Sequence, residues 1–154
     1  MTLDAALGAL EQLPAVSALR TSSLVYPLVN ALHIVGVALL FGAIVPLDLR
    51  LAGWRRDAGA VDGLARLLIP VAVGGLVLAI AAGLVLFATD ARAYAASPLF
   101  RAKLLLLAAA IANALALRRI DWRADATPRG AVAGAASILL WLAVIVLGRL
   151  IGYF

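Results

Sequence analysis

The chain has 154 residues, of which 66% are hydrophobic and only 14% are charged. A soluble domain of this length cannot bury so much apolar surface, and the apolar residues fall in long runs, so the composition indicates a membrane protein. The absence of cysteine excludes disulfides, thiolate metal sites and a cysteine nucleophile. The formal net charge is +5, but the basic residues flank the hydrophobic runs, so lipid headgroups and membrane orientation explain them better than nucleic acid does.

Residues 2–20 are predicted to form a short amphipathic helix that lies on the membrane surface. Leu3, Leu7 and Leu10 form one apolar stripe, whereas the polar residues lie away from it, and Pro14 is expected to end the helix. The segment lacks a basic start and a continuous apolar run, so we do not expect a cleaved signal peptide.

Four later segments are long enough to span a bilayer, because about 20 apolar residues cross it. They cover residues 24–47, 64–88, 98–117 and 128–152. Ser97 and Pro98 supply a helix cap and a first-turn proline at the start of the third span. Short connections favour antiparallel neighbours. The sequence therefore predicts an all-α fold, an integral membrane up-down four-helix bundle, with residues 1–154 as a single membrane domain.

The expected connections differ in positive charge on the two sides of the membrane. Arginines gather at the first and third connections, at positions 50, 55, 56, 66, 118, 119, 123 and 129. The other side carries Arg20, Arg92, Arg101, Lys103 and Arg149. Because positive connections stay in the cytoplasm, both termini are expected on the outer side of a bacterial inner membrane. Asp48 is expected at the cytoplasmic interface, where an ion pair with Arg50 would fix the end of the first span.

His33 is the only histidine in the chain, and it falls near the middle of the first span. With a rise of 1.5 Å per residue, it is expected about 14 Å below the outer surface of a hydrocarbon layer about 30 Å thick. Asn30 shares its helical face. An ionisable side chain at this depth is rare and needs an explanation.

The other three spans place their least ordinary residues at a similar depth. The second span has the pair Gly74 and Gly75, the third has Asn113, and the fourth has Trp141 with Ser137 one turn away. The sequence therefore predicts a polar layer near the middle of the membrane, opposite a wall lined by glycine.

Two interpretations of this layer stay open. Polar side chains in membrane helices commonly form interhelical hydrogen bonds that fix register, and His33, Asn30 and Asn113 are suited to this role. Alternatively, the layer is a cofactor site, since a neutral imidazole can ligate haem iron and a glycine pair lets a flat macrocycle approach the backbone. His33 is then the expected metal ligand. A two-histidine haem b would need a second ligand from a symmetric dimer or a partner subunit.

Cations at the outer end extend the candidate site. Arg101 and Lys103 lie in the first turn of the third span, where positive charge opposes the helix dipole unless an anion is near. Arg149 can reach the same region. A lipid phosphate is the simplest anion, and a haem propionate or quinone headgroup is the alternative. The candidate cofactor-binding residues are therefore His33, Asn30, Gly74, Gly75, Asn113, Trp141, Arg101, Lys103 and Arg149.

The stretches LHIVG, GAIVPLDLRLAG and SPLFRAKLLLLAAAIANALAL resemble a family of uncharacterised small bacterial four-helix integral membrane proteins, a domain of unknown function. The resemblance covers the chain from Tyr26 to about Leu117 and implies the fold but no activity. The membrane histidine followed by small residues is also remotely similar to copper-resistance D-type and cytochrome b-type bundles. Those proteins carry further histidines and a methionine cluster that this chain lacks, so the similarity does not favour copper.

Three functions are consistent with these patterns. The first is a haem- or quinone-associated electron-transfer protein, or a subunit of such a complex, with His33 as the midplane ligand. The second is a non-enzymatic structural or assembly subunit, and a small transporter is less favoured because no Asp or Glu is expected deep in a span. No catalytic residues are predicted, since there is no Ser-His-Asp set and no glycine-rich phosphate loop. The expected partners are membrane lipids and other subunits in a homodimer or larger membrane complex, and no nucleic acid is expected.

Overall fold

The computed structural model describes residues 2–54, 61–117 and 128–153. Four of the helices in these ranges are long and apolar enough to cross a membrane, and three are short. The helices are α1 (Leu3–Glu11), α2 (Pro14–Thr21), α3 (Val25–Leu51), α4 (Val61–Ala88), α5 (Ala91–Ala96), α6 (Pro98–Leu117) and α7 (Pro128–Leu150). The predicted all-α bundle with four spans and a helical N-terminal segment is confirmed, and the chain is an integral membrane protein with four candidate spans.

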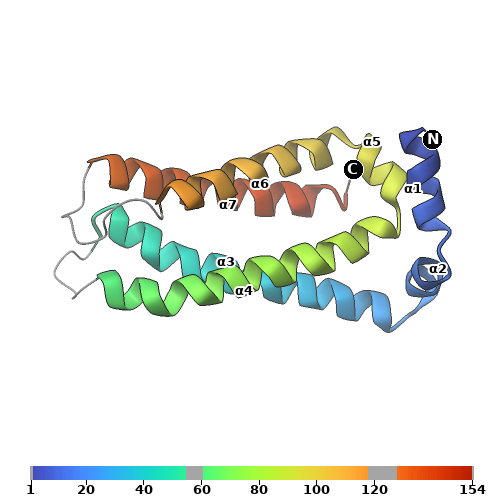
Figure 1. Cartoon of the computed structure of the whole chain (residues 1–154), viewed down its shortest axis with the longest axis horizontal. Coiled ribbons are helices and arrows are strands. Elements are labelled where there is room, and N and C mark those ends of the chain that lie inside the picture. Colours follow the sequence, from blue (N-terminus) through green and yellow to red (C-terminus); the bar gives the residue numbers. More distant parts are fainter. Residues whose placement is uncertain (1, 55–60, 118–127, 154) are drawn as a thin grey trace.

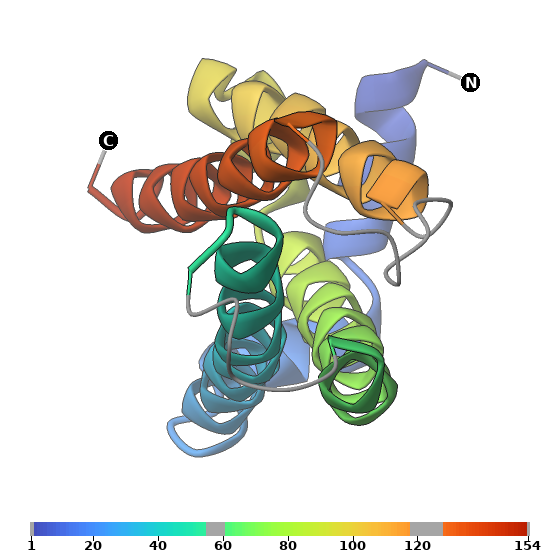
Figure 2. The same cartoon turned by 90° about the vertical axis from the view of Figure 1, so that its left-hand side faces the viewer.

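The four long helices pack as two pairs. α3 lies against α4, and α6 lies against α7. Figure 1 shows the pairs as two layers that run along the long axis of the molecule, and the end-on view of Figure 2 shows one layer above the other. The layers meet where α3 contacts α7. Both termini lie at the same end of the bundle, beside α1, α2 and α5 (Figure 1).

Two short helices, rather than one, form the N-terminal segment. Pro14 begins α2, because a proline at the first helical position needs no partner for an N–H group. Thr2 caps α1, where its hydroxyl accepts a hydrogen bond from the Ala5 N–H at 3.4 Å. Figure 1 shows α1 crossing the end of the bundle instead of following its long axis, an orientation that suits the membrane surface.

The ends of the long helices follow local signals in the sequence. Ser97 caps α6 as predicted, since its hydroxyl accepts from the Phe100 N–H at 3.3 Å and Pro98 takes the first position. α3 continues through Pro46 and ends at Leu51, beyond the expected residue 47. The sequence did not indicate α5, because its six residues are too few for a periodic pattern. The described ranges exclude the arginines at positions 55, 56, 118, 119 and 123, and also the side chain of Arg129.

A close glycine contact sets the distance between α3 and α4. A Cβ atom at Gly36 would lie 2.5 Å from the backbone nitrogen of Ala79, and one at Gly75 would lie 2.5 Å from the backbone nitrogen of Leu40. Both positions therefore require glycine. Small residues of this kind let membrane helices approach closely. Gly74 is different, because it is exposed and a Cβ there would have no atom within 4 Å.

Gly75→Ala is expected to lower the stability of the protein, whereas Gly74→Ala is not. The new methyl group at position 75 meets the backbone of α3, and overpacking of this kind costs about 1–3 kcal/mol. At position 74 it meets open space, and alanine gains roughly 1 kcal/mol of helix propensity over glycine. Thermal unfolding of both variants in one detergent, followed by circular dichroism, measures the difference. Equal stability of the two variants would contradict the close crossing.

One ion pair attaches the N-terminal helices to the bundle. The carboxylate of Glu11 accepts from the backbone N–H of Arg92 at 2.8 Å and from its Nε at 3.1 Å. The Arg92 guanidinium lies over Gly8, where a Cβ atom would come within 3.2 Å of it. The hydrogen bond from the Arg92 backbone holds the pKa of Glu11 below its ordinary value. The contact between α1 and α5 therefore depends on an ionised Glu11.

This contact is expected to weaken in acid. A carboxylate whose pKa is lowered by docking stabilises the docked state fully above its ordinary pKa of 4.5, and this contribution is lost as the pH falls through the lowered value. Hydrogen exchange of α1, corrected for the intrinsic rate at each pH, should lose protection in that range. Glu11→Gln should show weak protection already at neutral pH, and full protection in this variant would count against the ion pair as the attachment.

Candidate functional site

His33 lies in the contact between α3 and α4. Its Nδ1 atom is 2.7 Å from the carbonyl oxygen of Ala79. Gly83, one turn further along α4, makes room for the ring, since a Cβ atom there would be 3.2 Å from Cε1 of His33. Because a carbonyl oxygen only accepts, Nδ1 carries the proton, and in the neutral imidazole Nε2 keeps a free lone pair. The ring is thus held by the helix that pairs with its own.

Asn113 makes the equivalent contact in the other helix pair. Its side-chain Nδ2 donates to the carbonyl oxygen of Ala133 on α7 at 3.1 Å. His33 and Asn113 therefore each bond to the backbone within their own pair and not to each other. Asn30 is exposed on α3. Of the predicted polar layer, His33 therefore lies within the pair of α3 and α4, and Asn113 lies within the pair of α6 and α7.

Gly74 and Gly75, predicted as one wall of the site, have different surroundings. Gly75 is occupied by the crossing with Gly36, and Gly74 is exposed. The glycine that faces the imidazole of His33 is Gly83, one turn beyond Ala79. The depth calculated from the sequence did not distinguish these positions, because helix tilt can shift it by about one turn and α4 carries small residues over several turns.

The three outer cations have different neighbours. Arg101 donates to a backbone carbonyl of α5 at 3.0 Å, and Arg149 donates to the hydroxyl of Tyr153 at 2.7 Å. Lys103 is partly buried and packs over Gly148 of α7, where a Cβ atom would lie 3.3 Å from its Nζ. Of the three cations, Lys103 is partly buried and the two arginines are exposed.

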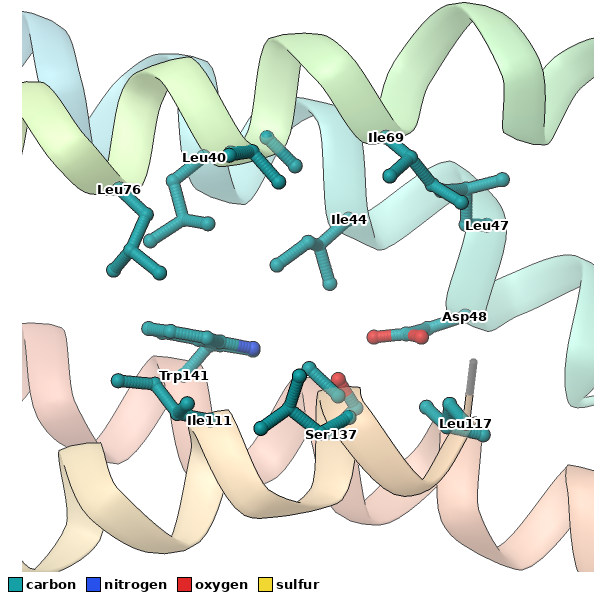
Figure 3. A pocket seen from close by; sticks show the side chains of 14 residues that line it. Leu40, Ile44, Leu47, Asp48, Ile69, Leu76, Ile111, Leu117, Ser137 and Trp141 are labelled. Atoms are coloured by element: carbon teal, nitrogen blue, oxygen red, sulfur yellow. The ribbon is translucent and has the colours of Figure 1, made fainter. Parts of the chain in front are cut away.

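A cavity of about 150 Å³ lies between the two helix pairs. All four long helices line it, mostly with aliphatic side chains, and Figure 3 shows them facing the space from both layers. Its polar lining residues are Asp48, Ser137 and Trp141. An engineered apolar cavity of about this volume binds benzene. The space is therefore large enough for about one six-membered ring.

Two polar atoms of this lining have no hydrogen-bond partner within the described part of the chain. They are Nε1 of Trp141, a residue 2% exposed, and Oδ2 of Asp48, a residue 4% exposed. Figure 3 shows the indole nitrogen and the carboxyl group pointing toward each other across the cavity. The hydroxyl of Ser137 hydrogen-bonds to the Asp48 side chain. Because a buried unpaired polar group costs roughly 1–3 kcal/mol, such atoms call for a partner that the described residues do not supply.

Asp48 is the residue of this site that sequence reasoning missed. It was expected at the cytoplasmic end of the first span in an ion pair with Arg50; in the structure it lies near the end of α3, and its side chain is buried and faces the cavity. The spacing of residues along α3 could have indicated this inward orientation. Leu40, Ile44 and Asp48 are spaced by four residues and share one face, and Leu40 belongs to the core of the bundle.

Trp141, with Ser137 one turn away, was predicted near the depth of His33, and both residues are buried in the lining of the cavity. They are four residues apart on α7 and line the cavity together with Asp48. His33 does not line this cavity. The structure therefore places the histidine apart from the tryptophan and the serine.

No family model, curated protein or solved structure matches the chain. The fold and the site define a four-span helical membrane protein with a polar-edged cavity between two helix pairs. Of the resemblance drawn from the sequence, the four-span helical shape is what the structure supports. Among the described residues, no group of three or more His, Cys, Asp or Glu side chains is arranged to hold a metal ion.

Asp48→Asn is expected to leave the stability of the protein unchanged or to raise it by about 1 kcal/mol. The amide has the shape of the carboxyl group but removes the cost of a buried, partly unpaired charge. Leu47→Asn is the matched control, because Leu47 is buried beside it and a new amide there should cost about 1–3 kcal/mol. Chemical or thermal unfolding compares the two. An equal loss of stability in both variants would show that the Asp48 carboxylate itself stabilises the fold.

Proposed function

We propose that the protein is a quinone-associated membrane protein, either an electron-transfer component or a subunit of one, and that the quinone ring binds in the cavity between the helix pairs. One observation supports this proposal: among the residues that the structure describes, Nε1 of Trp141 and Oδ2 of Asp48 have no hydrogen-bond partner, and both line a mostly apolar cavity. Small-molecule sites typically combine an apolar lining with a few polar groups that fix the orientation of the ligand.

A benzoquinone ring matches the cavity in size and in hydrogen-bonding pattern. The ring is flat and six-membered, and the cavity of about 150 Å³ admits one such ring. Its two carbonyl oxygens lie at opposite ends. Trp141 can only donate, so it suits one oxygen, and the carboxyl group of Asp48, which donates when it is protonated, faces the cavity from the other side and suits the second oxygen. A hydrocarbon tail on the ring is compatible with the surrounding lipid.

Haem is the alternative cofactor, and it rests on His33. A bond from one ring nitrogen to a backbone carbonyl is the arrangement that commonly orients metal-binding histidines. The chain, however, has one histidine, no cysteine and a single methionine at position 1, and its cavity is not lined by His33. A haem with two protein ligands therefore does not fit one chain. It would require a second copy in a homodimer, or a partner subunit in a larger complex.

A non-enzymatic structural or assembly subunit is the second candidate function. The observation in its favour is that His33 and Asn113 each join two neighbouring helices through a backbone carbonyl. Such bonds contribute about 0.6 kcal/mol on average in membrane bundles, and up to about 1.7 kcal/mol. This role accounts for both side chains without a ligand, but it leaves the unpartnered atoms of Asp48 and Trp141 unexplained.

We place the protein in the bacterial inner membrane with both termini on the outer side, on the basis of the arginine distribution in the sequence. Both termini share one end of the bundle (Figure 1), as an even number of spans requires. In this orientation Asp48 lies at the cytoplasmic end of α3, and His33 and Lys103 lie in the outer half.

A dimethyl-substituted benzoquinone is expected to quench the fluorescence of Trp141 when it is titrated into the detergent-solubilised protein. The measurement uses a chain that keeps Trp141 as its single tryptophan. Ala72→Leu should abolish saturable quenching, because Ala72 is buried and lines the cavity. Ala81→Leu, on the exposed face of the same helix, should leave it unchanged. Equal quenching in both variants would mean that the ring does not enter the cavity.

The absorption spectrum of protein purified from haem-replete cells separates the alternatives. A Soret band that disappears in His33→Ala would favour haem, with a second ligand from another chain. A colourless, stably folded protein that also shows no saturable quinone binding would favour the structural or assembly role.

A further inference from the structure

We infer that the cavity takes its ligand from the lipid phase: it opens between α4 and α6, and the ligand carries a hydrocarbon tail that leaves through this opening. This route rests on the proposed quinone site. It adds the chemical class of the ligand, a ring with a long apolar tail, and the side of the bundle from which the ring enters.

The polar and the apolar lining of the cavity come from different helices. Asp48 belongs to α3, and Ser137 and Trp141 belong to α7. α4 and α6 contribute only aliphatic side chains. Figure 3 shows examples of these, with Ile69 and Leu76 on α4 facing Ile111 on α6. A polar ligand group is therefore bound by α3 and α7, and the wall formed by α4 and α6 suits a hydrocarbon.

The two layers of the bundle are in close contact on one side. In the described part of the chain they meet through α3 and α7, and α4 and α6 make no comparable contact. The end-on view of Figure 2 shows α3 beneath α7 on one side of the bundle and α4 and α6 on the other. The cavity is thus closed by a helix contact on its polar side and not on its aliphatic side.

Two lining residues mark the opening. Val73 of α4 is 46% exposed and Leu115 of α6 is 53% exposed, although both line the cavity. The polar lining residues are all buried. Side chains that border the cavity and are also exposed lie at its mouth. Because α4 and α6 are both candidate membrane spans, the surroundings of this mouth are lipid.

The size of the cavity requires a tail to pass through this mouth. The volume of about 150 Å³ admits roughly one six-membered ring and leaves no room for a long chain. With the ring bound at Trp141 and Asp48, whose carboxyl group can hydrogen-bond in either protonation state, a tail extends past Val73 and Leu115. It meets only aliphatic side chains there. The tail also concentrates the ligand in the bilayer, where the opening lies.

A decyl-substituted benzoquinone with a photoreactive diazirine on its tail tests this route. The protein is reconstituted in phosphatidylcholine vesicles, irradiated and digested, and the labelled positions are found by mass spectrometry. An excess of unlabelled decyl-benzoquinone should remove the labelling that comes from the site, whereas labelling from the bulk lipid persists. The labelling that is removed should fall on α4 near Val73 and on α6 near Leu115.

Val73→Phe and Val77→Phe are the matched pair of variants. Both valines are exposed on α4, one turn apart, but of the two only Val73 lines the cavity. The larger side chain at position 73 narrows the opening, so Val73→Phe should raise the Kd for decyl-benzoquinone about tenfold. Val77→Phe should leave it unchanged. Quenching of Trp141 in the single-tryptophan chain measures both values, and matching unfolding curves show that both variants are folded.

The outcomes separate this route from the proposed function. If the removable labelling falls on α3 or α7, or if the two variants bind alike, the ligand enters elsewhere while the quinone site stands. If light scattering shows a native dimer that Val73→Phe breaks up and Val77→Phe keeps, a second copy covers the opening and the tail does not. If the native chain shows neither saturable quenching nor removable labelling, the proposed function fails and the route fails with it.

Discussion

The close crossing of α3 and α4 at Gly36 and Gly75 is the contact on which the rest of the structure depends. Lipid tails are as apolar as leucine, so membrane helices associate through close packing and interhelical hydrogen bonds instead of the hydrophobic effect. The crossing brings the backbones near enough for His33, one turn away, to reach the Ala79 carbonyl at 2.7 Å. Gly83, a further turn along α4, then makes room for the ring. One face of small residues on α4 thus fixes the first helix pair.

A second glycine places the other pair against the first. A Cβ atom at Gly134 would lie 2.7 Å from the Asp48 carbonyl oxygen, so α7 approaches the backbone of α3 at that residue. This contact brings Ser137, one turn later on α7, to the Asp48 side chain. The cavity between the two layers lies beside this contact, since Asp48 and Ser137 both line it.

The spans were predictable from the sequence, whereas the rotation of each helix was not. Long apolar runs and the Ser97 cap gave the number of spans and the start of α6, because length and capping are local properties. The long helices are apolar on every face, so the periodicity that separates inside from outside in a soluble bundle is missing. Depth could be calculated from the rise per residue, and it placed His33 and Trp141 at similar levels. It could not show that they face different neighbours or that Asp48 turns inward.

His33 and Asp48 differ in whether their polar atoms have hydrogen-bond partners. Nδ1 of His33 is satisfied by the Ala79 carbonyl, so the sole histidine of the chain already has a structural explanation. Oδ2 of Asp48 and Nε1 of Trp141 are unsatisfied within the described residues, in a part of the protein that water does not reach freely. Leucine and phenylalanine at these two positions would avoid that cost. A ligand that hydrogen-bonds to both atoms removes both costs at once, which makes the cavity a stronger candidate for the functional site than the histidine.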